Sequence, residues 1–258
     1  MSFKLPTAIQ HFIGDAVLKA DDIGESPCDV YSFQRGNDRF FLKYCPVILA
    51  PTTYSVLREA RVLSWLKGRL NVPEVVMVDH NDEGEYMITR CVPGEPLQAR
   101  INDPASITAL FHDALRQVQA VSVDDCPFDS SIEVRLRELE YLLTHGLGEI
   151  NLDLLQWPHL NTGQKLLTHL NSTLPSESRV FSHGDLCDAN VFVDAQDNLH
   201  FIDLGRGGIA DRWLDIAFIH RNLRKKVSDK SADDFLQDLG EPDNSAKREY
   251  FEQLDEFF

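Results

Sequence analysis

The stretch SHGDLCDAN, residues 182–190, decides how the rest of the chain is interpreted. It holds an aspartate, Asp185, that is followed five residues later by an asparagine, Asn190. A further aspartate, Asp203, comes 13 residues after Asn190 within FIDLGR, residues 201–206. An aspartate that caps a turn, an asparagine in a loop and an aspartate at a strand end are each common. All three in this order and spacing indicate a catalytic site.

The five-residue spacing is that of kinase catalytic loops, with Gly184 where protein kinases carry an arginine. In phosphoryl transfer the aspartate of this loop, here Asp185, accepts or orients the proton of the attacking hydroxyl. The asparagine, here Asn190, faces the metal that bridges the phosphates. Residues 191–203 predict a hairpin around the turn AQDN, which sets Asn190 and Asp203 at neighbouring strand ends. Both residues offer hard oxygen ligands, so the sequence predicts a Mg²⁺ site.

The front of the chain supplies a lysine suited to phosphates, Lys43, directly after the apolar stretch Phe40–Leu42. Strand alternation places Phe41 and Lys43 on one face, so Phe41 flanks the nucleobase while Lys43 reaches the phosphates. Glu59 lies on the core-facing stripe of a helix predicted over Tyr54–Leu70, where a carboxylate is rarely buried without a partner. The two charges predict a Lys43–Glu59 ion pair like that of kinases.

A loop over Gly24–Val30, GESPCDV, stands where kinases place a glycine-rich loop over the phosphates, although it contains a single glycine. Its backbone N–H groups and the Ser26 hydroxyl are suited to cradle a phosphate. A plain connection between strands explains this segment equally well. His183, two residues before Asp185, is of a residue type suited to a general base.

The order of the predicted elements indicates a β-rich front and a mostly helical remainder. Strands are predicted at residues 15–19, 30–34, 39–44, 75–79 and 85–90. After a Pro93-Gly94 breaker, helices are predicted at residues 107–121, 132–145, 164–172, 213–225 and 246–258. Short strands are predicted among them at residues 180–182, 191–193 and 200–203. We therefore expect an α+β, protein-kinase-like two-lobed fold, with a nucleotide-binding N-lobe at 1–92 and a C-lobe at 93–258.

The composition indicates which kinds of binding partner and which cellular compartment to expect. The 258 residues carry no stretch that resembles a signal peptide and no apolar run near the ~20 residues of a membrane span. The five cysteines lack metal-ligand or redox spacing, which favours a reduced, cytoplasmic setting. With 25 basic and 41 acidic residues, the formal net charge is −16. Such a surface repels nucleic acid and anionic membranes, and it attracts polycations.

Five stretches resemble the aminoglycoside 3′-phosphotransferases. They are SHGDLCDAN at 182–190, FIDLGRGGIADRWLDIAF at 201–218, GESPCDVYSF at 24–33, TTYSVLREARVLSWL at 52–66 and LDEFF at 254–258. The resemblance runs over nearly the whole chain, and the last three stretches are the more particular to the 3′ enzymes. It implies transfer of the terminal phosphate of ATP or GTP, with Mg²⁺, to the 3′-hydroxyl of an aminoglycoside. Antibiotic resistance is the implied outcome, and the expected state is a monomer or weak dimer.

The resemblance also implies roles for individual residues. Asp185 is the catalytic base or hydroxyl-orienting residue, and Asn190 and Asp203 hold Mg²⁺. His183 supports the catalytic loop and is not the general base. The nucleotide is bound by Lys43, Glu59, Ser26, Phe41, Arg90 and Val92, the last two within a hinge strand whose backbone reads the base edge. The polycationic substrate is contacted by Arg206, Arg221, Asp153, Asp255, Glu256 and Phe258. Clustered carboxylates and the chain-terminal carboxylate suit the ammonium groups of an aminoglycoside.

Two departures from the family pattern concern the substrate. Lys225 and Lys226 stand where the family commonly has acidic residues, and the substrate-covering loop near Glu149–Thr162 is short and poor in acids. Two alternatives therefore stay open, a kinase of another small hydroxylated molecule and a non-catalytic nucleotide-binding module. A protein kinase is disfavoured, because the seven residues between Asp203 and Asp211 leave no room for an activation loop.

Overall fold

The computed structural model describes residues 4–21, 27–147, 156–240 and 242–256. The chain divides into two compact units. Unit 1 comprises Met1–Gly94 and Phe192–Arg206, and unit 2 comprises Glu95–Val191 and Gly207–Phe258. The predicted boundary lay between residues 92 and 93, and the prediction placed all of 192–206 in the second lobe. In unit 1, this segment is joined to the loop after α2 (Val56–Leu66) by the Phe201 N–H, which donates to the Asn71 carbonyl at 2.9 Å.

Unit 1 is built on a five-stranded antiparallel sheet in the order β1-β2-β3-β5-β4. The strands are β1 (Lys19–Ala20), β2 (Asp29–Arg35), β3 (Asp38–Pro46), β4 (Val75–His80) and β5 (Gly84–Arg90). In the register of β3 with its neighbours, Lys43 lies opposite Val30 on one side and Met87 on the other. Lys43 therefore sits on a central strand.

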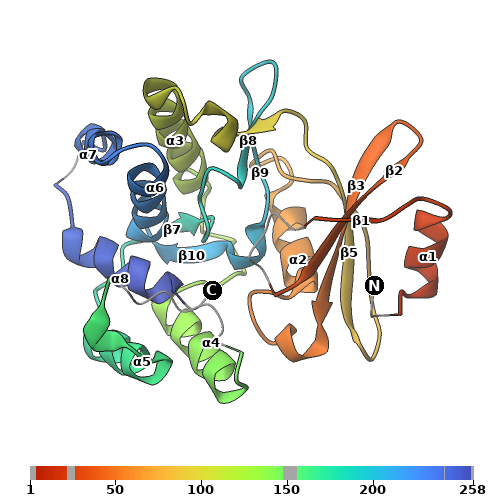
Figure 1. Cartoon of the computed structure of the whole chain (residues 1–258), viewed down its shortest axis with the longest axis horizontal. Coiled ribbons are helices and arrows are strands. Elements are labelled where there is room, and N and C mark those ends of the chain that lie inside the picture. The colour runs from red at the N-terminus through yellow and green to blue at the C-terminus, as the bar shows by residue number, and fades with distance from the viewer. Residues whose placement is uncertain (1–3, 22–26, 148–155, 241, 257–258) are drawn as a thin grey trace. The chain divides into compact units, whose positions relative to one another are not determined.

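The two faces of this sheet are covered by different helices (Figure 1). On one face, α1 (Thr7–Ile13) packs Ile9 and Ile13 into an apolar cluster with Phe40 and Leu42 of the sheet. Side chains alternate across a strand, so Phe41 and Lys43 point to the opposite face. That face is covered by α2 (Val56–Leu66), which packs against β4 and β5. Ser55 caps α2 by accepting the Arg58 N–H at 3.1 Å.

Unit 1 is completed by short elements at its edges. These are η1 (Val47–Leu49), β8 (Val191–Val193, which begins in unit 2), β9 (Leu199–Phe201) and η4 (Leu204–Arg206). Gly94, at φ 91°, lies where a Cβ atom would stand 2.1 Å from the Val193 carbonyl oxygen. Glycine is required at this close approach.

Unit 2 is largely helical and carries a two-stranded antiparallel ribbon. Its helices are α3 (Pro104–Gln119), α4 (Ile132–Thr144), α5 (Gly163–Ser172), α6 (Trp213–Lys226), α7 (Asp229–Asp238) and α8 (Ser245–Asp255). The smaller elements are β6 (Glu95–Pro96), η2 (Leu97–Arg100), η3 (Pro158–Leu160), β7 (Arg179–Ser182) and β10 (Gly208–Asp211). Helix α6 packs against α3, α7 and α8 (Figure 1), and nine of its residues are buried. Strand β7 pairs with β10 and ends immediately before His183.

Within the described ranges, no helix has both the length and the apolar character that crossing a membrane requires.

Candidate active site

Asp185 and Asn190 meet in unit 2 within the loop that follows β7. The Nδ2 group of Asn190 donates to the Asp185 carboxylate at 2.9 Å and to the Asp185 carbonyl at 3.0 Å. Because Nδ2 makes both bonds, Oδ1 is the atom of the Asn190 amide suited to a cation or another donor. The five-residue spacing thus closes a small ring that fixes the Asp185 side chain relative to Asn190.

The loop is anchored by Asp215 of α6, a residue to which the sequence prediction assigned no role. Its fully buried carboxylate accepts the backbone N–H of His183 at 2.9 Å and that of Gly184 at 3.0 Å. Burial raises the pKa of Asp215, while nearby His183 and the two N–H donors oppose that change. Gly184 has φ 86°, which explains why glycine stands there. The Nδ1 atom of His183 accepts the Asp185 N–H at 3.3 Å, in agreement with a structural role.

Arg135 of α4 provides a further anchor that the sequence prediction missed. Its side chain is almost completely buried, and its guanidinium donates to the Gly184 carbonyl at 3.2 Å. In the sequence this residue belongs to the charged run of an amphipathic helix, which favours an exposed position. Only the long-range contact distinguishes it from a solvated arginine.

Lys43, Glu59 and Asp203 come together in unit 1. The Lys43 ammonium donates to both Glu59 oxygens, at 2.9 and 3.0 Å, and also to the Asp203 carboxylate. The Lys43 and Glu59 side chains are 15% and 8% exposed, whereas that of Asp203 is 49% exposed. The predicted Lys43–Glu59 ion pair is therefore formed. Both side chains are largely buried, and Glu59 is the more buried of the two.

The electrostatics of this trio keep Lys43 charged. Burial alone would lower its pKa, but the Asp203 and Glu59 carboxylates outweigh burial, and the pKa is raised. Asp203 adopts φ 59°, a left-handed conformation that few residues other than glycine accept. Such strain is characteristic of functional positions.

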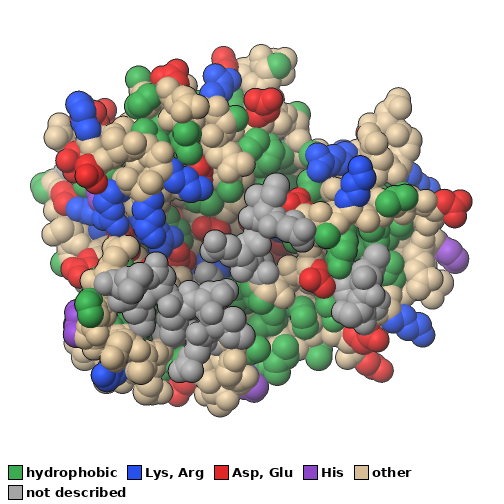
Figure 2. Space-filling model, viewed as in Figure 1, with side chains coloured by type: hydrophobic (Ala, Val, Ile, Leu, Met, Phe, Trp, Pro, Cys, Tyr) green, Lys and Arg blue, Asp and Glu red, His purple; other side chains and the backbone are tan. Residues whose placement is uncertain are grey.

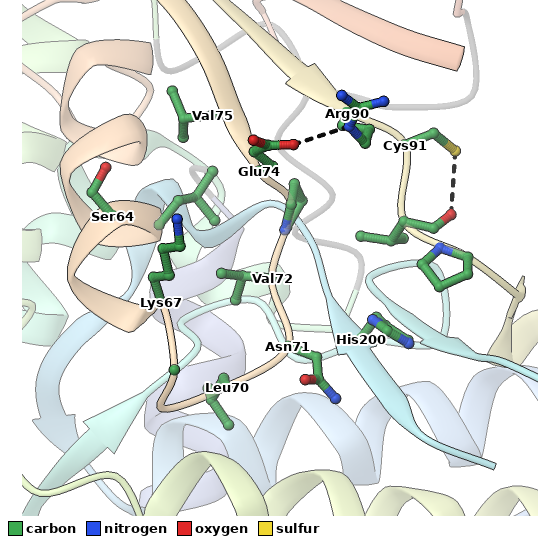
Figure 3. Close-up of a pocket in the computed structure, with 15 residues that line it drawn as sticks. Ser64, Lys67, Leu70, Asn71, Val72, Glu74, Val75, Arg90, Cys91 and His200 are labelled. Atoms are coloured by element: carbon green, nitrogen blue, oxygen red, sulfur yellow. Dashed lines mark hydrogen bonds and ion pairs between the residues drawn. The ribbon is translucent and has the colours of Figure 1, made fainter. Parts of the chain in front are cut away.

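The hinge strand borders a cavity of about 500 Å³ within unit 1 (Figure 3). Arg90 and Val92 line it, together with the end of α2 and the following loop. The Arg90 guanidinium is held by Glu74 at 2.9 Å and by Asp38 at 2.5 Å. The Arg90 side chain is therefore engaged by two carboxylates of neighbouring residues. On the α2 face, Arg39 lies 5.1 Å from the centre of the Phe41 ring.

Among the described residues predicted to bind substrate, Arg206, Arg221 and Asp255 contact other protein groups. Arg206 donates to the Tyr54 hydroxyl at 3.1 Å. Arg221 of α6 forms an ion pair with Asp255 of α8, and both side chains are mostly buried. For Arg221, burial lowers the pKa, but Asp255, Glu252 and Glu256 reverse the shift, and the pKa is raised. Ser26, Asp153 and Phe258, also predicted to be site residues, lie outside the described residues.

The exposed surface of α6 and α8 carries both basic and acidic side chains. Figure 2 shows Lys and Arg side chains gathered over α6 and α8. The last turn of α6 contributes Arg224, Lys225 and Lys226. Of these, Arg224 pairs with Glu252 at 2.7 Å, and Lys226 pairs with Asp188 at 3.0 Å. Lys225 is exposed.

Comparison with known proteins shows which family the chain is related to. A model of the phosphotransferase enzyme family matches residues 24–251. The chain belongs to this family. It is 40% identical, over 98% of its length and 99% of the relative's, to an aminoglycoside 3′-phosphotransferase from Acinetobacter baumannii. The predicted resemblance to these enzymes is thereby confirmed.

Solved structures of family members have the same fold. A crystal structure of an aminoglycoside 3′-phosphotransferase of type VIII superposes with a TM-score of 0.84 at 28% identity and 97% coverage of both chains. An aminoglycoside phosphotransferase from Streptomyces rimosus, in complex with ADP and streptomycin, gives a TM-score of 0.78 at 22% identity, covering 96% of this chain and 95% of the other. The predicted protein-kinase-like fold is confirmed by these neighbours.

The predicted metal ligands offer oxygen donors, which are the type that Mg²⁺ takes. Within the described part of the chain, no three His, Cys, Asp or Glu side chains gather as a metal site. The predicted ligands are one amide oxygen, from Asn190, and one carboxylate, from Asp203. Mg²⁺ characteristically takes one or two carboxylates and completes its shell with water and substrate phosphates. The residues present are therefore suited to this ion.

Proposed function

We propose that this phosphotransferase moves the terminal phosphate of ATP or GTP onto the 3′-hydroxyl of an aminoglycoside and so confers resistance. The observation that carries the proposal is 40% identity over almost the full chain to an aminoglycoside 3′-phosphotransferase. It is supported by the Lys43–Glu59 pair and by the Asp185–Asn190 loop, since kinase chemistry needs both.

Nucleotide binding is assigned to unit 1. Lys43 is charged and held between two carboxylates, which suits a group that grips phosphates. Phe41 shares its face of the sheet and offers a ring to the base, and the hinge backbone at Arg90 and Val92 reads the base edge. Ser26 belongs to the proposed phosphate loop. The S. rimosus relative was solved with ADP, which is consistent with this assignment.

The metal belongs to the same proposal. Asn190 and Asp203 are the residues that would hold Mg²⁺, and they flank the β8–β9 segment, one before it and one after it. When bound, Mg²⁺ neutralises charge on the phosphates. Lys43 already contacts Asp203, so this carboxylate is oriented before nucleotide arrives.

Asp185 is proposed to orient the acceptor hydroxyl and to take its proton. The acceptor oxygen forms a bond to the terminal phosphorus as the bond from that phosphorus to the bridging oxygen breaks, which releases ADP or GDP. Asn190 holds the Asp185 carboxylate in place during this step. Catalysis then rests mainly on positioning and charge neutralisation.

An acidic protein suits a polycationic acceptor. The net charge of −16 draws aminoglycosides toward the surface. Glu256, Asp153 and the terminal carboxylate of Phe258 remain the proposed ammonium contacts. Arg206, Arg221 and Asp255 complete the proposed set, although the Arg221–Asp255 pair neutralises part of the charge that Asp255 offers.

The proposal is tested by incubating the protein with ATP or GTP, Mg²⁺ and a panel of acceptors. The panel should contain several aminoglycosides, an amino alcohol and a neutral sugar. We expect a mass increase of one phosphoryl group on aminoglycosides that carry a 3′-hydroxyl. Phosphorylation of the amino alcohol or the sugar alone would replace this function with another small-molecule kinase. Nucleotide binding without transfer to any acceptor would indicate a non-catalytic module.

A further inference from the structure

Asp188 is a buried carboxylate in the middle of the catalytic loop, three residues after Asp185 and two before Asn190. Its side chain is 0% exposed. One oxygen, Oδ1, accepts the Asn222 side-chain amide at 2.8 Å and the Lys226 ammonium at 3.0 Å. The other oxygen, Oδ2, is buried without a hydrogen-bond partner among the described residues. The proposed chemistry gives Asp188 no direct part.

A carboxylate buried this completely is unfavourable unless a positive charge compensates it. Asn222 contributes a neutral amide, so Lys226 supplies the compensating charge. The Lys226 side chain is 47% exposed, and only its ammonium end reaches the buried oxygen. Loss of Lys226 would leave Asp188 with a single neutral donor.

Three side chains on one face of α6 form hydrogen bonds with the catalytic loop at different points. Asp215 lies in the first turn, Asn222 follows seven residues later, and Lys226 lies four residues beyond Asn222. Residues at these spacings share one side of a helix. Asp215 holds the start of the loop through the N–H groups of His183 and Gly184, and the other two hold Asp188.

From this arrangement, and on the basis of the proposed function, we infer that Lys226 is a positioning residue for phosphoryl transfer. It fixes Asp188 and thereby the relative placement of Asp185 and Asn190. Its ammonium is directed to the loop, so the lysine at this position is an internal counter-ion rather than a substrate contact. The Gln98 N–H, which donates to the Asp188 carbonyl at 3.1 Å, restrains the same residue from the backbone side.

The test compares four proteins with the wild type in steady-state transfer to an aminoglycoside. Lys226→Met removes the counter-ion, and Lys226→Arg retains it. Lys225→Met removes the same charge from the neighbouring exposed position and serves as the matched control. The double variant Asp188→Asn/Lys226→Met removes both charges, so no buried charge is left without compensation. Each protein is also measured for its affinity for a fluorescent nucleotide and for hydrogen exchange over residues 185–190.

We expect Lys226→Met to lower kcat by about 10- to 100-fold, because small displacements of a catalytic group are costly. Nucleotide affinity and both KM values should stay within about twofold, and hydrogen exchange over the loop should increase. Lys226→Arg should retain most of the activity. The double variant should exceed Lys226→Met by about fivefold or more, since contacting residues couple. Lys225→Met should resemble the wild type.

Three outcomes would overturn the inference: an unchanged kcat in Lys226→Met, an equal loss in Lys225→Met, or no recovery in the double variant. A rise confined to the acceptor KM would make Lys226 a substrate contact instead. A wild-type protein that transfers phosphate to no aminoglycoside refutes the proposed function rather than this inference. In that case hydrogen exchange of the loop still tests whether Lys226 holds Asp188.

Discussion

Glu59→Gln tests whether the buried ion pair in unit 1 serves the nucleotide. The substitution keeps the size of the side chain and one acceptor oxygen, and it removes the charge that faces Lys43 at 2.9 Å. Lys43 keeps Asp203 as a partner, so the ammonium does not become an isolated buried charge. The cost is therefore that of a charge-assisted hydrogen bond, about 1.5–3 kcal/mol, rather than that of a fully orphaned ion.

The expected loss of stability is measurable. In a protein of this size each kcal/mol lowers Tm by about 2–4 °C, so the variant should melt about 3–12 °C below the wild type. Lys43 should also shift toward Asp203 and away from its proposed place at the phosphates, which raises the nucleotide KM. Thermal unfolding and steady-state kinetics measure the two effects.

Glu74→Gln is the matched control for this prediction. It removes a carboxylate from the Arg90 pair, in which Glu74 is 59% exposed. Exposed pairs contribute about 0–1 kcal/mol, so Tm should fall by no more than about 4 °C. Equal losses of Tm in the two variants, with an unchanged nucleotide KM in Glu59→Gln, would refute the reasoning.

Three further substitutions probe the loop and the acceptor side. Asp185→Ala should lower kcat by at least ~10²–10⁴-fold while nucleotide binding persists, and near-normal turnover would remove Asp185 from catalysis. Asp215→Asn should lower both Tm and kcat, because an amide oxygen replaces a carboxylate that accepts two N–H groups; an unchanged Tm in thermal unfolding would argue against this anchor. Arg221→Met should destabilise the protein by ~1.5–3 kcal/mol, because it removes a charge-assisted hydrogen bond to the mostly buried Asp255. A change in acceptor KM at unchanged Tm would instead make Arg221 chiefly a substrate contact.

Local patterns predicted most of the elements because their signals lie within each segment. Alternation located β2, β3 and β5, and helical spacing located α3 to α6 and α8. The strand predicted over residues 15–19 was wrong, since only Lys19–Ala20 pairs as β1, and Val17 is 74% exposed. Ala16 and Leu18 are only partly buried against the apolar cluster, whereas the unpredicted α1 contributes the buried Ile9 and Ile13.

Two other elements escaped prediction for related reasons. Helix α7, DKSADDFLQD, is dominated by polar residues, and its burial rests on Ser231, Ala232, Phe235 and Leu236. Their spacing and the Ser228 cap are signals that the acidic run obscured. Strand β10 is four residues long and is defined by its pairing with β7, a contact that spacing alone does not reveal.

In the candidate site, too, contacts between residues near in sequence were predictable, whereas long-range contacts were not. The Asp185–Asn190 contact follows from a spacing of five residues, and the Lys43–Glu59 pair follows from a charge on an apolar stripe. Asp215 and Arg135 hold the same loop from 31 and 49 residues away. No periodicity points to such contacts, so these anchors became visible only in the folded chain.

The most direct test of the central claim is an assay of ADP or GDP release in the presence of Mg²⁺. It offers kanamycin beside a homologue that lacks only the 3′-hydroxyl. Phosphoryl transfer at that position predicts turnover with kanamycin and none with the deoxy compound. Equal turnover with both, or none with either from folded protein that binds nucleotide, would contradict it.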